Sequence, residues 1–141
     1  MKKSILYSLL IVIIFLCPKS HAQSLTPSQI KQIEEIAQTI ASQHNANSRS
    51  LQDDMTVSSH AVAVSRNVRF TNVLRVRKGL SNTDLKLFRN ELIQEILPKA
   101  CQQNANNPAF KRGLFYTFIY KNTYGEKLAE FDVDQRSCNN L

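Results

Sequence analysis

The order of sequence patterns predicts an α+β fold, in which two β-hairpins separated by a helix form a four-stranded antiparallel sheet covered by helices. Three observations carry this prediction. Apolar residues recur at helical spacing in two segments, they alternate with polar residues in four others, and the order of these segments is α-β-β-α-β-β. Two local hairpins and two amphipathic helices fit together most simply when both helices cover the sheet.

The amino terminus has the three zones of a secretory signal peptide: two lysines, an uncharged apolar run over residues 5–17, and a polar stretch that ends at Ala22. We therefore expect a signal peptide over 1-22 and one domain over 23-141. A retained membrane anchor is the rival interpretation, but the run spans about 13 residues and a membrane-spanning helix needs about 20. Lipidation of Cys17 is a further alternative, and the bulky Leu16 before it argues against a lipoprotein signal.

Cleavage changes the charge of the protein. Three of the 18 basic residues lie before the cut, so 15 remain against 11 acidic residues, for a net charge of +4. This excess favours anionic partners such as lipid head groups, lipopolysaccharide or an acidic protein. It is lower than is usual for a dedicated nucleic-acid binder, so no specific nucleic-acid partner is expected. No transmembrane span is expected after cleavage.

Cys101 and Cys138 are the two cysteines that survive cleavage, and we expect them to form a disulfide because exported proteins reach an oxidising compartment. The alternatives are a zinc site or a nucleophilic thiol. Two isolated cysteines supply too few zinc ligands, and no accompanying histidine spacing completes such a site.

The first helix is predicted to begin after Thr26, because Thr26 can cap it, Pro27 fits its first turn and Gln29 can complete a capping box. The residues that follow place one apolar stripe at helical spacing: Ile30, Ile33, Ile36, Ala37, Ile40 and Ala41. This stripe is typical of a helix packed on a sheet.

Alternation from about residue 56 predicts two strands with a turn near Ser65-Arg66-Asn67. One face of the second strand carries the apolar set Val68, Phe70, Leu74 and Val76. The opposite face, with the residue beside it, forms the candidate binding surface for an anionic partner: Arg69, Arg75, Arg77 and Lys78. The alternative is an ordinary solvated sheet face whose charges oppose aggregation.

The second helix is predicted to begin after Ser81, which with Asp84 resembles a capping box. Its apolar face is broad and suited to covering the sheet: Leu85, Phe88, Leu92, Ile93, Ile96, Leu97 and Ala100. Pro98 is expected to end or kink this helix near Leu97.

Residues 114–133 predict the last hairpin, with its turn around Asn122-Thr123-Tyr124-Gly125. Tyr116 and Tyr120 share one face of the first strand, as the residues of a stacking platform would, but buried cross-strand aromatic pairs need no ligand. The disulfide would then tie the end of the second helix to the tail after the last strand.

The sequence contains no recognisable catalytic pattern, and we predict neither an enzyme nor a cofactor or metal site. His44 and His60 have no convincing neighbour, and Asp53 and Asp54 adjoin one another in a loop. Phosphate-binding glycine loops, nucleophile elbows and zinc-helix motifs are absent from the sequence.

The carboxyl-terminal part, from Cys101 through Tyr116, Tyr120 and Gly125 to Cys138, resembles the disulfide-tied hairpin of small periplasmic accessory proteins. These include pilotins, which escort secretin subunits of the outer membrane. The resemblance implies that a peptide binds in a groove between helix and sheet, and it assigns no contact residue. Pilotins are typically lipoproteins, and this sequence departs from that pattern at Leu16-Cys17.

Two functions therefore stand as hypotheses. The first is a non-enzymatic exported bacterial protein that binds another protein or an envelope component, as a periplasmic accessory or secretion-related factor. The alternative is a secreted effector or virulence factor, including a hydrolase whose residues are not adjacent in sequence. Retention in the periplasm would favour the first, and release into the medium the second.

Overall fold

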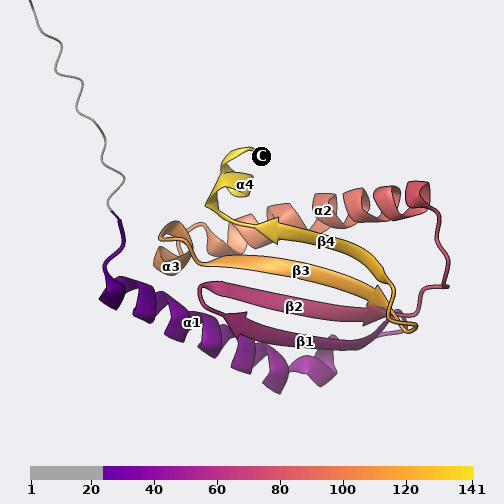
Figure 1. Cartoon of the computed structure of the whole chain (residues 1–141), viewed down its shortest axis with the longest axis horizontal. Coiled ribbons are helices and arrows are strands. Elements are labelled where there is room, and N and C mark those ends of the chain that lie inside the picture. Colours follow the sequence, from indigo (N-terminus) through magenta and orange to yellow (C-terminus); the bar gives the residue numbers. More distant parts are fainter. Residues whose placement is uncertain (1–23) are drawn as a thin grey trace, which may run out of the picture.

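A computed structural model describes residues 24–141 of the chain (Figure 1). The predicted signal peptide over residues 1–22 lies outside these described residues. The elements follow in the order α1 (Pro27–Ala46), the 3-10 helix η1 (Ser48–Leu51), β1 (Thr56–Val64), β2 (Asn67–Leu74), α2 (Asn82–Asn104), α3 (Pro108–Lys111), β3 (Phe115–Asn122), β4 (Lys127–Val133) and α4 (Gln135–Asn139).

Both long helices begin where the sequence predicts, because each has a capping box. The Thr26 side chain accepts a hydrogen bond from the Gln29 backbone N–H, and the Gln29 side chain accepts one from the Thr26 N–H at 2.9 Å. Ser81 and Asp84 exchange the same pair of bonds at the start of α2. These bonds satisfy backbone donors that have no partner within the helix.

Of the two effects expected of Pro98, an end or a kink near Leu97, the end is not found, because α2 continues through Pro98 to Asn104. Proline removes one intrahelical hydrogen bond, which destabilises a helix interior. The turns that follow are held by tertiary contacts, since Ala100 is buried and Cys101 is bonded to Cys138. Tertiary structure therefore extends the helix beyond its local stop signal.

The predicted element order and the four strands are confirmed, but the sheet is mixed rather than wholly antiparallel. Its strand order is β1-β2-β3-β4, with antiparallel pairs at both edges and a parallel pair, β2 and β3, in the centre. Helix α2 carries the chain back along the sheet after β2, so β3 starts at the end where β2 started. Such helical crossovers connect parallel strands, whereas tight turns connect antiparallel ones.

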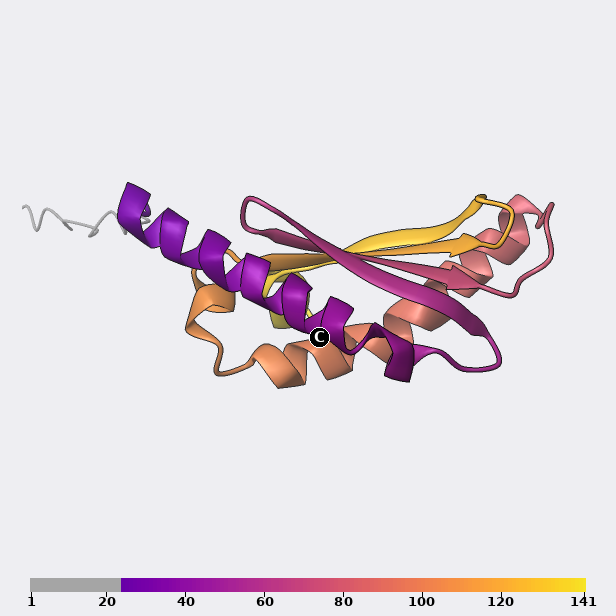
Figure 2. The ribbon, with the colours of Figure 1, turned by 90° about the horizontal axis from the view of Figure 1, so that it is seen from below.

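The helices cover one face of the sheet and leave the other open, so the fold has two layers (Figure 2). Helix α1 packs on β1 and β2, and α2 packs on β4. On the helix side, Ala61 is 2% exposed and Val68 is fully buried. On the open side, Val62 and Val64 are 48% and 55% exposed.

Some of the most deeply buried side chains lie where α3 meets the sheet. Phe110 is 2% exposed, and its ring stacks on that of Tyr116 with centroids 5.7 Å apart. Leu114 and Val133 have no exposed surface. The predicted disulfide is present between Cys101 in α2 and Cys138 in α4, with Cα atoms 5.5 Å apart.

Candidate functional site

A groove of about 650 Å³ lies between α1 and α2, over the helix side of the sheet. Its floor is aromatic, with Phe70 from β2 and Tyr116, Phe118 and Tyr120 from β3. Its walls include Ile40 and His44 from α1, Leu51 from η1, and Ile96 and Ala100 from α2. The groove exists because α1 packs on β1 and β2 while α2 packs on β4, which leaves a gap between the two helices over the centre of the sheet.

The aromatic floor is a connected row across three strands. The Phe70 and Phe118 rings are directly opposite one another in the parallel pair and stack with centroids 5.2 Å apart. Phe118 stacks in turn on Phe131 of β4 at 5.5 Å. Rings supported by neighbouring rings present a large, rigid apolar surface, which suits binding of apolar side chains.

At one end of the groove the side chains are polar and hydrogen-bond to one another. The Tyr116 hydroxyl donates to Asn104 Oδ1 at 2.8 Å, and Asn107 Nδ2 donates to the same oxygen at 3.0 Å. Burial raises the pKa of Tyr116, and burial together with the nearby Glu95 carboxylate raises the pKa of Tyr120 to about 12. Both tyrosines are therefore uncharged at physiological pH, and no Lys, Arg, Asp or Glu of the described chain lines the groove.

A chain of three polar side chains, His44, Ser59 and Asn72, reaches from the α1 wall onto the floor. The Ser59 hydroxyl donates to Asn72 Oδ1 at 2.7 Å and lies 2.8 Å from His44 Nε2. Because the single hydroxyl proton points to Asn72, Ser59 accepts from His44, so the ring carries its proton on Nε2. The His44 and Phe70 rings also pack in a T-shaped arrangement, with their centroids 4.8 Å apart.

The pKa of His44 lies below its usual value of 6.5, first because burial disfavours the charged ring and further because His60 is close. The folded protein therefore resists protonation of His44, whereas the unfolded chain takes up that proton near pH 6.5. This difference contributes stability above pH 6.5 that is lost as the pH falls through the lower pKa of the folded state.

We expect the variant His44→Gln to show a smaller loss of stability between pH 7.5 and pH 5 than the natural protein. Glutamine can still donate to Ser59 but does not titrate. The carboxylates with lowered pKa, such as Asp53 and Glu130, lose their stabilising contribution only below their usual values of 3.8 and 4.5. Urea unfolding at both pH values measures the effect, and an equal loss in both proteins would contradict it.

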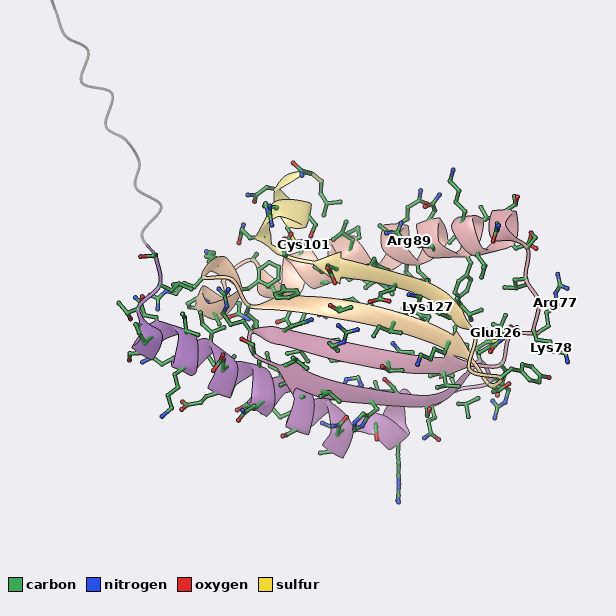
Figure 3. All side chains as sticks on the ribbon, in the orientation of Figure 1. Arg77, Lys78, Arg89, Cys101, Glu126 and Lys127 are labelled. Carbon is green, nitrogen blue, oxygen red and sulfur yellow. A yellow bond between two sulfur atoms is a disulfide. The ribbon has the colours of Figure 1, made fainter. Side chains whose placement is uncertain are left out.

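Arg69, Arg75 and Arg77 do not share one strand face as predicted, because β2 ends at Leu74. Arg69 lies on the open sheet face, 3.5 Å from Glu130, whose carboxylate also pairs with Lys127. Arg75 follows the end of β2 and donates to the backbone carbonyls of Asp53 and Asp54. Arg77 and Lys78 lie farther along the loop to α2, beside the β3–β4 turn (Figure 3).

Lys78 and Arg69, at opposite ends of this basic set, each contact a different residue. Lys78 Nζ lies 5.9 Å from the ring centroid of Tyr124 in the β3–β4 turn, while Arg69 and Lys127 share Glu130. The structure thus divides the set into a paired part on the sheet and a loop part at its end. That these residues bind an anionic partner stays a prediction.

The residue patterns by themselves do not identify the lining of the groove. The sequence shows no convincing neighbour for His44, and the structure gives it Ser59 and Phe70. Ser59 and Asn72 are opposite one another in the β1–β2 ladder, so a correct hairpin register could have revealed that pair. The other sequence pattern that points to the groove is the spacing of Tyr116 and Tyr120, which places both side chains on the same face of β3. Both rings are largely buried, yet both line the groove.

Solved structures with a similar fold include three chains from bacteria. AspS, the type II secretion pilotin of Vibrio cholerae, is 18% identical, with a TM-score of 0.58 over 79% of this chain and 96% of the pilotin. EpsS, the type 2 secretion pilotin of Vibrio vulnificus, is 18% identical, with a TM-score of 0.59 over 80% and 97%. This fold is similar to that of type II secretion pilotins.

The third structure is a protein from Pseudomonas aeruginosa, 9% identical, with a TM-score of 0.56 over 82% of this chain and 99% of the other. The predicted pilotin-like resemblance is thus confirmed at the level of the fold. No protein-family model and no curated protein matches the sequence.

Two further observations concern residues 24–141. Every helix there is too short or too polar to cross a bilayer. Within the same range, no three His, Cys, Asp or Glu side chains gather in a way that could hold a metal ion.

Proposed function

We propose that this protein is an exported, non-enzymatic accessory factor of a secretion system, whose groove binds an apolar segment of a secretin subunit. The observation that carries the proposal is the uncharged groove between α1 and α2, floored by Phe70, Phe118 and their neighbours. The similarity in fold to type II secretion pilotins supports it. The proposal includes cleavage after Ala22, which would release the domain on the far side of the inner membrane.

The shape and chemistry of the groove favour a helical or extended peptide over a small polar molecule. Amphipathic helices bind in apolar grooves through side chains spaced three or four residues apart. Each apolar side chain that becomes fully buried contributes about 1.5–3 kcal/mol, part of which offsets the entropy lost on association.

Overlapping fluorescent peptides that span the secretin subunit of the same organism test this proposal. We expect one apolar segment to bind saturably in an anisotropy titration, and its affinity to change little between low and high salt, because no Lys, Arg, Asp or Glu of residues 24–141 lines the groove. Binding that weakens strongly with salt would instead indicate the basic residues Arg69, Arg75, Arg77 and Lys78. Failure of every peptide to bind would contradict the proposal.

A further inference from the structure

The asparagines that line the groove differ in how much of their hydrogen-bonding capacity the protein uses. Asn104 accepts from Tyr116 and donates to the Ala100 carbonyl at 2.9 Å. Asn107 accepts from the Ala109 N–H and donates to Asn104. Asn72 accepts from Ser59 through Oδ1, but its Nδ2 has no partner among the described residues.

The free Nδ2 of Asn72 faces the groove. Every fully buried side-chain nitrogen and oxygen of the described chain has a hydrogen-bond partner, so an Nδ2 without one must be in contact with solvent. Asn72 lines the groove on the helix side of β2, in the row that includes Phe70. Ser59 fixes the amide by its bond to Oδ1, and His44 fixes Ser59. The floor thus presents two oriented N–H groups among aromatic rings.

The residues around Asn72 determine which chemical group of a ligand can accept hydrogen bonds from its Nδ2. A ligand that fills the groove displaces the water around Nδ2, and an amide left without a partner there costs about 1–3 kcal/mol. A carboxylate on the ligand would be poorly matched, since the described groove lining contains no cation to offset its desolvation. An uncharged amide accepts from Nδ2 and can donate in return to the second lone pair of Asn72 Oδ1.

We propose that the segment bound in this groove carries one asparagine or glutamine among its apolar residues, and that Asn72 selects it by pairing with its side-chain amide. This inference rests on the proposed function and adds the chemistry of the partner. Asn72 acts as a specificity residue, Ser59 and His44 as positioning residues, and Phe70, Phe118 and Ile96 supply the apolar contact.

A display library of amphipathic helical peptides, randomised at the positions of the apolar face, tests the inference even where the natural partner has not been identified. Selection on the natural protein is expected to enrich Asn or Gln at one position and apolar residues at the others. A synthetic pair with Gln or Met at that position, which have similar sizes, should differ about 5- to 150-fold in affinity, in favour of Gln.

The variant Asn72→Leu removes the amide but keeps a side chain of similar volume, and it should reverse the preference to Met over Gln. Gln103→Leu is the matched control, because Gln103 also lines the groove and the change is again from amide to leucine. It should leave the preference for Gln unchanged. Should Asn72→Leu fail to fold, Ser59→Ala serves instead, since it removes the bond that orients the amide and should reduce the preference.

Four outcomes would overturn the inference. If selection enriches only apolar residues, or if Asn72→Leu retains the preference for Gln, the groove still binds peptides but Asn72 does not select an amide. Asn72 is also not the selecting residue if Gln103→Leu abolishes the preference for Gln as completely as Asn72→Leu does. A library that yields no groove-binding sequence overturns the proposed function together with the inference, so the two failures are distinguishable.

Discussion

Replacing Cys101 and Cys138 with alanine is expected to lower the free energy of unfolding by about 3–4 kcal/mol in the chain-entropy model. The disulfide closes a loop with a sequence separation of 37 residues, which restricts the unfolded chain. A loss of this size is a large share of the stability of a small domain. For a domain of this length it corresponds to a fall in melting temperature on the order of 10–20 °C.

Thermal and urea unfolding of the natural protein, with and without reductant, provide the control. Reduction of the natural protein should reproduce most of the loss, whereas the double variant should be insensitive to reductant. The bridge also anchors α4, a short helix after the last strand, to α2. A double variant that melts within about 2 °C of the oxidised protein would contradict the prediction.

The variant Ile96→Glu is expected to weaken binding of apolar peptides to the groove by at least ~100-fold. Ile96 is partly buried on α2 and lines the groove. The change removes an apolar contact and places a carboxylate where no Lys or Arg among residues 24–141 lines the groove. Anisotropy titration with a peptide selected on the natural protein measures the effect.

Leu87→Glu is the matched control for Ile96→Glu, because it introduces the same side chain on the same helix. Leu87 is 59% exposed and does not line the groove, so we expect its affinity to remain within about twofold of the natural value. Circular dichroism melts verify that both variants fold. Equal binding by the two variants would place the peptide elsewhere, with the open sheet face as the next candidate.

The fold explains why one domain offers two surfaces of different chemistry. The helix side contains the uncharged groove, whereas the open face places Arg69 and Lys127 around Glu130. Those cations hold the pKa of Glu130 below its usual value, chiefly through the hydrogen bond from Lys127. A partner bound in the groove and one bound on the open face would therefore respond differently to salt, which makes ionic strength an informative variable in each binding experiment.

Much of the fold could be predicted from the sequence because its signals are local. The capping boxes at Thr26 and Ser81 require residues only three positions apart, and strand alternation is visible within a few residues. The disulfide between Cys101 and Cys138 was predictable because only two cysteines remain after the predicted cleavage. These features depend on identity and spacing rather than on distant partners.

The tertiary structure alone decided the parallel pairing of β2 with β3, which sheet face is open and which residues line the groove. Alternation predicts that a strand has two faces, but it does not say which neighbour the strand pairs with or which face the helices cover. Asn72 lies between Thr71 and Val73 in a sequence that contains no sign of a site. It becomes a candidate specificity residue only because Ser59 is opposite it and both helices leave the centre of the sheet uncovered, and these contacts join residues far apart in the chain.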